Sequence, residues 1–198
     1  MSQPCAVVLA AGHGRRFAEA AGAGANKLLA SCIGWDGVER PVLDHTLRAF
    51  SAWRGERVLV VREGCQALID LGTRHGFEIV FVASAGMGDS LGAAVRARPK
   101  ADGWLVTLGD MPWVRPATLA QVTAGLVAQT ACVPVYQGRW GHPVGFGSSF
   151  AQPLAALQGD QGGRRLLQDG KATLVEVDDP GVLRDVDVPG DLNGQSKP

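Results

Sequence analysis

The chain contains five short runs that are almost entirely apolar, without the polar residues at alternate positions that mark a half-exposed strand. These runs cover residues 5–11, 57–61, 78–82, 104–108 and 132–136. Such runs are typical of strands that are covered on both faces. Between and after them lie stretches with helical periodicity, at residues 42–53, 65–75, 90–98 and 116–129. This alternation predicts a three-layer α/β/α fold, in which helices flank a mostly parallel central sheet.

The length of the chain suits one hydrophobic core. With 198 residues, of which 46% are hydrophobic, we expect a single domain over residues 1–193 and a disordered tail at 194–198. Beyond residue 136 the pattern predicts helices at 149–157 and 163–168 and a last strand at 173–177. Residues 22–25 and 31–40 are expected to be mobile loops.

Charge and cysteine content narrow the classes of partner. Lys plus Arg and Asp plus Glu both number 19, so no net charge favours nucleic acid or an anionic membrane. A small-molecule partner fits better. The 4 cysteines lie far apart, which argues against a zinc knuckle or a disulfide framework and favours a reducing cytoplasm. The run at 5–11 reads as a strand rather than a signal peptide, and no segment approaches the ~20 apolar residues of a membrane span.

The first apolar run ends in a loop with features of a phosphate site. Gly12 and Gly14 allow backbone N–H groups to approach phosphate oxygens, and one of the two arginines, Arg15 or Arg16, supplies a cation. The dinucleotide motif GxGxxG would need glycine where Phe17 stands, and the P-loop motif is also missing. Taken alone, the pattern fits a plain strand-to-helix turn with exposed arginines about twice as well.

Two acidic segments are candidates for a metal site. Asp110 follows the run at 104–108 and is expected at the end of a strand, where open α/β sheets bind ligands. Asp185 and Asp187 alternate along an extended segment, so both point to one side. Carboxylates together with substrate phosphates suit Mg²⁺. The alternative for each segment is a turn-forming aspartate that caps the next element.

Six motifs, in order, resemble those of one enzyme family. LAAGHGRRF at 9–17 followed by KLL at 27–29 resembles the nucleotidyltransferase signature LAAGxGxRFG…PKLL, with Ala18 and Asn26 as departures. LGDMP at 108–112 and DVDVPGDL at 185–192 are similar to L[AG]DMP and DIDTPEDL. GMGDSL at 86–91 is similar to GMSSSL, with Asp89 as a departure. GHPV at 141–144 is identical to the corresponding motif, and GDQGGR at 159–164 is similar to GDxGAR.

On these motifs the chain resembles the molybdenum cofactor cytidylyltransferases of the MobA-like NTP transferase family. The resemblance implies a Rossmann-like nucleotidyltransferase fold, with a nucleotide-binding half at 1–112 and an acceptor-facing half at 113–193. It implies a catalytic role for Arg16, Lys27 and Asp110, and metal binding by Asp110 and Asp187. The implied nucleotide-binding residues are Leu9, Ala10, Ala11, Gly12, Gly14, Arg16, Lys27, Gly86, Met87 and Ser90, and the implied acceptor-binding residues are His142, Pro143, Asp160 and Arg164.

The reaction implied by the resemblance is transfer of CMP from CTP to the phosphate of a molybdopterin-type acceptor, with Mg²⁺ or, as a substitute, Mn²⁺. A molybdenum hydroxylase would receive the product. Ala11, where guanylyltransferases have glycine, favours CTP because glycine leaves more room for a purine. The alternatives are a GTP-dependent or sugar-phosphate nucleotidyltransferase of the same fold, and a non-catalytic accessory protein of a molybdenum hydroxylase. Phe17 disfavours a dinucleotide-dependent oxidoreductase.

Overall fold

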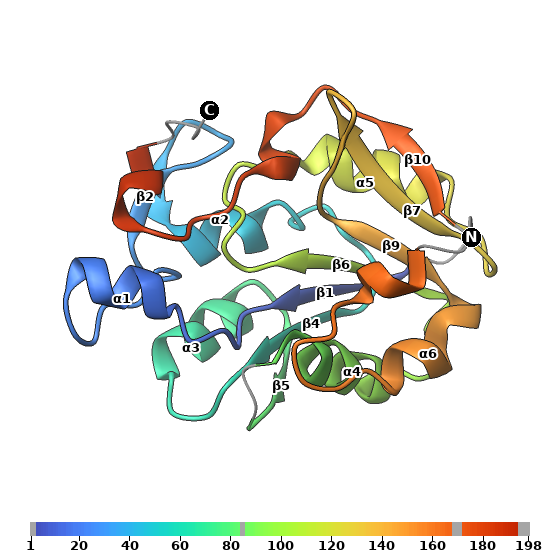
Figure 1. Ribbon diagram of the computed structural model, residues 1–198, viewed down its shortest axis with the longest axis horizontal. Helices are drawn as coiled ribbons and strands as arrows, with labels where there is room; N and C mark the ends of the chain where they lie inside the picture. Colours follow the sequence, from blue (N-terminus) through green and yellow to red (C-terminus); the bar gives the residue numbers. More distant parts are fainter. Residues whose placement is uncertain (1–2, 84–85, 168–171, 194–198) are drawn as a thin grey trace.

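An eight-stranded, mostly parallel sheet forms the centre of the molecule (Figure 1). The computed structural model describes residues 3–83, 86–167 and 172–193, so the tail expected at 194–198 lies outside the described residues. The order of the strands is β10-β7-β9-β6-β1-β4-β5, and β8 pairs with β7. Their bounds are β1 (Cys5–Leu9), β4 (Arg57–Val61), β5 (Glu78–Phe81), β6 (Gly103–Leu108), β7 (Ala131–Tyr136), β8 (Arg139–Trp140), β9 (Val144–Gly147) and β10 (Ala172–Glu176).

The register of the central strands follows from their apolar sequences. β1 runs parallel to both β4 and β6, and Val7 lies opposite Val58 on one side and Val106 on the other. Successive residues of β1 enter different cores, because Ala6 and Val8 belong to one buried cluster and Cys5 and Val7 to the other. The prediction of a parallel sheet covered on both faces is therefore confirmed for these strands.

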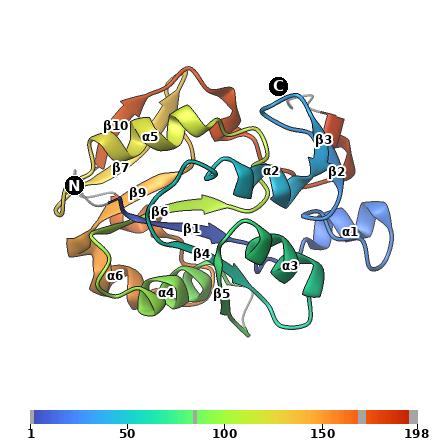
Figure 2. The same cartoon turned by 180° about the vertical axis from the view of Figure 1, so that it is seen from behind.

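Helices cover both faces of the sheet (Figure 2). Residues of α2, α3 and α5 contribute to one buried cluster, and residues of α4 and α6 contribute to the other. The α-helices are α1 (Arg15–Ala21), α2 (Val42–Arg48), α3 (Gln66–Arg74), α4 (Met87–Ala97), α5 (Pro116–Ala124) and α6 (Ala151–Ala155). Four short 3-10 helices are η1 (Ser148–Phe150), η2 (Gly163–Leu167), η3 (Pro180–Leu183) and η4 (Pro189–Asn193). No helix among the described residues is long and apolar enough to cross a membrane.

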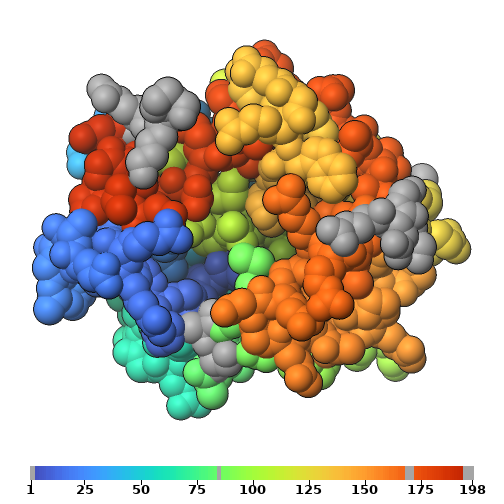
Figure 3. Space-filling model, in the orientation of Figure 1, coloured from blue at the N-terminus to red at the C-terminus, as the bar shows by residue number. Residues whose placement is uncertain are grey.

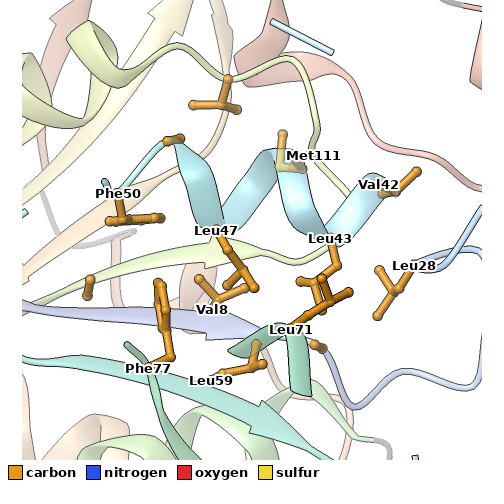
Figure 4. Close-up of a cluster of buried hydrophobic side chains, with 14 of the residues drawn as sticks. Val8, Leu28, Val42, Leu43, Leu47, Phe50, Leu59, Leu71, Phe77 and Met111 are labelled. Atoms are coloured by element: carbon orange, nitrogen blue, oxygen red, sulfur yellow. The ribbon is translucent and has the colours of Figure 1, made fainter. Parts of the chain in front are cut away.

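The larger core lies between the sheet and α2 and α3 (Figure 4). Leu43 and Leu47 of α2 are fully buried, and Leu59 of β4 and Leu71 of α3 belong to the same cluster. A helix of 7 residues is too short to be stable by itself. Burying a leucine side chain stabilises a protein by about 1.5–3 kcal/mol, so packing against the core stabilises α2.

Several elements differ from the sequence-based expectations. The segment at 31–40, expected to be a loop, contains the hairpin of β2 (Ser31–Ile33) and β3 (Glu39–Pro41), which is fixed by a bond from Trp113 Nε1 to the Ile33 carbonyl. β5 was expected to be buried on both faces but is an edge strand with Phe81 50% exposed. α5 ends at Ala124 rather than at 129, and Gly125 follows as its C-cap residue.

Two further corrections concern the length and number of elements. α2 ends at Arg48, five residues before the expected end at 53. β9 was not predicted from the sequence. It lies between β6 and β7 and runs antiparallel to both. Its sequence, VGFG, is too short and too rich in glycine to stand out as a strand. The site depends on β9, because residues 141–143 lead directly into it.

Candidate active site

The loops after β1 and β6 lie side by side at one edge of the sheet. These two strands are neighbours and parallel, so their carboxyl ends meet at the same edge. The N–H of Gly109 donates to the carbonyl of Leu9 at 2.8 Å, which joins the two loops directly. Figure 3 shows a hollow on this face. The blue N-terminal segment, the red C-terminal segment and the orange segment around residues 140–165 border it. The motifs at 9–17 and 108–112 are therefore brought together.

The glycines of the first loop permit its course. Gly14 is the N-cap of α1 and has φ 58°, a left-handed conformation that favours glycine. A Cβ atom at Gly12 would meet no atom within 4 Å, so the backbone there is open to a ligand. Phe17 is only 3% exposed. It packs into the core beneath α2 and α3 and anchors α1 behind this loop.

Four charged side chains form a chain of ion pairs beside this loop. The Lys27 Nζ lies 2.5 Å from Asp110 Oδ2 and 3.7 Å from Asp187 Oδ1. The Arg16 guanidinium lies 2.5 Å from Asp187 Oδ2. The Lys27 and Asp110 side chains are 14% and 15% exposed, whereas that of Arg16 is 75% exposed. Residues from three distant segments of the sequence thus form one cluster of alternating charge.

The two carboxylates of this cluster fit a divalent metal ion. Both lie within 3.7 Å of the same Lys27 nitrogen, so they converge on a common point. Oδ1 of Asp110 is buried and has no hydrogen-bond partner within the described part of the chain. No group of three or more His, Cys, Asp or Glu among the described residues is arranged to hold a metal. A hard ion such as Mg²⁺ needs only one or two carboxylates when phosphates and water complete its shell.

The C-terminal acidic segment is held against the loop after β6. The N–H of Val186 donates to the Asp110 carbonyl at 2.9 Å, and Val186 is fully buried. Asp187 thereby reaches the ion cluster. The Asp185 residue is exposed at the surface. Its pKa is nevertheless raised, mainly by partial desolvation and to a smaller extent by repulsion from the Asp110 and Asp187 carboxylates.

Asp191 has a role at this site that sequence reasoning missed. Its Oδ2 accepts hydrogen bonds from the N–H groups of Asp187 and Val188, at 2.9 and 2.8 Å. These bonds fix the backbone of the proposed metal ligand. The signal was an aspartate just after the turn at Pro189, a position at which such side chains bind nearby backbone N–H groups.

Asn26 supports the turn that carries Lys27. Its Oδ1 accepts from the N–H of Leu28 at 3.0 Å, and its Nδ2 donates to the Cys65 sulfur at 3.6 Å. Cys65 is the N-cap residue of α3. The side-chain amide therefore connects the Lys27 turn to the start of a packed helix, in the position where the resembling motif has proline.

A cavity of about 150 Å³ lies between the first loop and α4. It is lined by Leu9, Ala10, Ala11, Gly12, Gly14, Lys27, Leu28, Met87, Ser90, Leu108 and Asp110. All but two of the residues assigned to the nucleotide by resemblance are in this set. The exceptions are Arg16, which lies in the ion cluster, and Gly86, which packs elsewhere.

Gly86 and Gly88 allow close contact between α4 and the loop at 158–161. A Cβ atom at Gly86 would lie 2.4 Å from the Gly159 oxygen, and one at Gly88 would lie 2.7 Å from the Gln161 oxygen. The N–H of Gly88 donates to the Gly159 carbonyl at 2.8 Å. The N–H of Gly88 is therefore bonded within the protein and is not free for a ligand. Ser90 still lines the cavity, with its hydroxyl donating to the Gly86 carbonyl at 3.0 Å.

A second, mainly apolar cavity of about 240 Å³ adjoins the first. The two share Leu9, Met87 and Leu108. The second cavity extends to His142 and Arg164, with the remaining wall formed by Leu91, Val106, Val133, Trp140, Gly141, Val144, Phe146, Gly162, Gly163 and Leu167. Two residues predicted to contact an acceptor lie outside this wall: Pro143 is buried behind it after a cis peptide bond, and Asp160 is exposed on the 158–161 loop.

His142 presents an imidazole to the second cavity. Burial lowers its pKa, although a hydrogen bond with the Val106 backbone and the charge of Asp110 oppose this effect. Its Nδ1 is buried and has no hydrogen-bond partner within the described residues. The N–H of His142 donates to the Val182 carbonyl at 2.9 Å, which fixes the residue in place. The ring is therefore a neutral hydrogen-bonding group facing an apolar space.

A glycine loop, a Lys–carboxylate cluster and two adjoining cavities at the carboxyl edge of a parallel sheet define a nucleotide-binding α/β protein. The chain belongs to the MobA-like NTP transferase domain family, whose model matches residues 6–176.

Two solved structures resemble this chain over nearly its whole length, and one curated relative resembles about half of it. The structure of Rv0371c from Mycobacterium tuberculosis H37Rv is 30% identical, with a TM-score of 0.77 and 96% of each chain covered. A nucleotidyl transferase from Methanothermobacter thermautotroptrophicus is 25% identical, with a TM-score of 0.79 and 96% and 94% covered. A curated relative, purine catabolism protein PucB of Bacillus subtilis (strain 168), is 32% identical over 112 residues, which is 54% of each chain. The match thus spans about half the length of this relative.

Proposed function

We propose that this protein transfers CMP from CTP to the terminal phosphate of a molybdopterin-type acceptor, releasing pyrophosphate. The observation that carries the proposal is the position of the Lys27–Asp110–Asp187 cluster beside two adjoining cavities. The cavity beside the glycine loop suits a nucleotide. The larger apolar cavity suits a planar heterocyclic acceptor better than a sugar phosphate, because its wall offers few polar groups.

The chemistry requires no nucleophile from the protein. An oxygen of the acceptor phosphate attacks the α-phosphorus of CTP, the bond from that phosphorus to the bridging oxygen breaks, and pyrophosphate leaves with the electron pair. Catalysis then rests on alignment of the two phosphates and on neutralisation of negative charge. Lys27 and Arg16 are the cations at this position, and Gly12 and Gly14 allow backbone N–H groups to approach the triphosphate.

Asp110 and Asp187 are the proposed ligands of a divalent cation, Mg²⁺ or Mn²⁺. When bound, this ion supplies positive charge to the phosphate oxygens. A solved manganese complex of the Mycobacterium tuberculosis protein, 29% identical with a TM-score of 0.68 and 89% and 87% of the chains covered, supports divalent metal use. Lys27 exchanges its carboxylate partner for phosphate oxygens as the metal and nucleotide enter.

On the acceptor side we propose contacts from His142 and Arg164. The neutral imidazole offers hydrogen bonds without adding charge, and the Arg164 guanidinium pairs with an anionic group of the acceptor. Pro143 and Asp160 act through the shape of the loops that carry His142 and Arg164. A molybdenum hydroxylase is the proposed recipient of the product, and the free cysteines fit a reducing cytoplasm.

Product analysis tests the proposal. Purified protein is incubated with Mg²⁺, molybdenum cofactor and each of the four ribonucleoside triphosphates in turn, and the products are identified by mass. We expect the cytosine dinucleotide form of the cofactor with CTP. A guanine dinucleotide would favour the GTP-dependent alternative, and binding of cofactor without any pyrophosphate release would favour the accessory-protein alternative.

A further inference from the structure

The second cavity, which we call the acceptor cavity, opens outward at Trp140 and Arg164. Beyond it lies a shallow surface hollow lined by Gly138, Arg139, Trp140 and Arg164, which we call the outer hollow. Trp140 and Arg164 line both spaces, so a ligand that fills the acceptor cavity and extends outward passes between these two side chains. Trp140 is 41% exposed, an unusual exposure for a large aromatic residue at the mouth of a cavity.

The backbone around Trp140 is positioned by strand pairing and by one hydrogen bond. β8 is paired with β7, with Trp140 opposite Val135. The connecting turn has positive φ at both central residues, 50° at Gln137 and 74° at Gly138. Gln137 is the one non-glycine residue with positive φ among the residues that the structure describes, and such a conformation costs energy. The chain after β8 is fixed by the bond from the Gly141 N–H to the Pro134 carbonyl at 2.9 Å.

The outer hollow also holds two positive charges without an anionic partner. Within residues 3–83, 86–167 and 172–193, the side chains of Arg139 and Arg164 form neither an ion pair nor a hydrogen bond. Arg16, Arg40 and Arg98, in contrast, are paired with carboxylates. Two unpaired guanidinium groups beside an exposed indole attract a ligand that is both planar and anionic.

We propose that Trp140, Arg139 and Arg164 form an outer subsite, which binds the end of the acceptor remote from the reacting phosphate. Its ligand class is a planar heteroaromatic group that bears a negative charge. The indole contacts the face of the ring system, and the guanidinium groups pair with the charge. The identity of the ligand as the acceptor rests on the proposed function, whereas the binding of planar anions does not.

Binding of two fluorescent probes tests the subsite without any need for turnover. Pterin-6-carboxylate is planar and anionic, and unsubstituted pterin is planar and uncharged; each is titrated with the protein, and the probe emission is followed. We expect Trp140→Ala to weaken binding of both probes about tenfold. We expect Arg139→Gln to weaken binding of the carboxylate about fivefold or more and to leave the neutral probe nearly unchanged.

Arg165→Gln is the matched control, because Arg165 is exposed on η2 but lines neither cavity. An equal loss in Arg165→Gln and Arg139→Gln, or no loss in Trp140→Ala, would overturn the subsite. If the probes bind as expected but no triphosphate yields product with the cofactor, the subsite stands and the proposed reaction fails. If the wild type makes the dinucleotide product and Trp140→Ala has unchanged KM for the acceptor, the reaction stands and the subsite fails.

Discussion

The ammonium group of Lys27 lies 2.5 Å from Oδ2 of Asp110, whose carboxylate we propose as a metal ligand. A lysine cation and a metal cation therefore compete for the same carboxylate. This competition makes tight metal binding depend on the nucleotide, whose phosphates draw Lys27 away from Asp110 and complete the metal shell.

Replacing Lys27 by glutamine should raise the affinity for free Mn²⁺ while lowering transfer. Removing a charge that lies within 4 Å of both carboxylates should tighten Mn²⁺ binding by roughly tenfold or more, which is ~1.4 kcal/mol. Electron paramagnetic resonance of Mn²⁺ without nucleotide measures this affinity. Lys100→Gln, at an exposed lysine of a separate hollow, is the control. Weaker Mn²⁺ binding in Lys27→Gln would contradict the competition.

Asn26 should order the Lys27 turn through its bond to Cys65. Asn26→Asp keeps the acceptor for the Leu28 N–H but loses the donor to the sulfur, which is worth about 0.5–1.5 kcal/mol. We expect Lys27 to be acylated severalfold faster relative to Lys100, and kcat to fall with little change in KM. Mass spectrometry after brief acylation measures the first effect. Equal rates of Lys27 acylation in variant and wild type would show that the bond does not position the lysine.

The choice of nucleotide should depend on the methyl group of Ala11. Ala11 lines the cavity beside the glycine loop and is 2% exposed. A change of one methyl group in a pocket is worth ~1–3 kcal/mol, so Ala11→Gly should raise kcat/KM for GTP roughly tenfold or more and change that for CTP less. The ratio of the two kcat/KM values is the informative quantity, since added backbone freedom can lower both. A fixed ratio would remove Ala11 as a determinant of base choice.

Protonation of His142 should be disfavoured in the folded protein. Because burial lowers its pKa, the unfolded chain takes up the proton first as the pH falls, and stability is lost below the ordinary histidine pKa of about 6.5. Above that pH the group contributes no pH dependence. The difference in unfolding free energy between wild type and His142→Gln should therefore be flat above about pH 6.5 and fall below it. A difference that grows as the pH rises would have the wrong sign.

The central fold was predictable from sequence because its strands are continuous apolar runs. Residues 57–61 were expected as a strand and form β4 with the same bounds. The β2–β3 hairpin and β9 were not predictable, because they are short and depend on distant partners. The Ile33 carbonyl, for example, is held by Trp113, 80 positions along the chain.

The candidate site was predictable where residue type and strand ends coincide. Asp110 and Gly12 follow neighbouring strands, so their proximity follows from the parallel sheet. The role of Asn26, the bonds from Asp191 and the contact between Gly88 and Gly159 were not visible, because each requires knowledge of which distant loops meet. The unpaired state of Arg139 and Arg164 likewise emerges only from the three-dimensional arrangement.

The most direct measurement of the account is the stoichiometry of transfer by wild type and Asp110→Asn. Asn is nearly isosteric with Asp but lacks the charge that binds the metal and pairs with Lys27. With CTP labelled at the α-phosphate, Mg²⁺ and molybdenum cofactor, the wild type should release one pyrophosphate for each labelled CMP joined to the acceptor. We expect Asp110→Asn to lose this transfer by a factor of about 10³ or more while retaining its melting temperature within a few degrees. Near-normal transfer by Asp110→Asn in saturating Mg²⁺, or label that never leaves CTP in the wild type, would contradict the account.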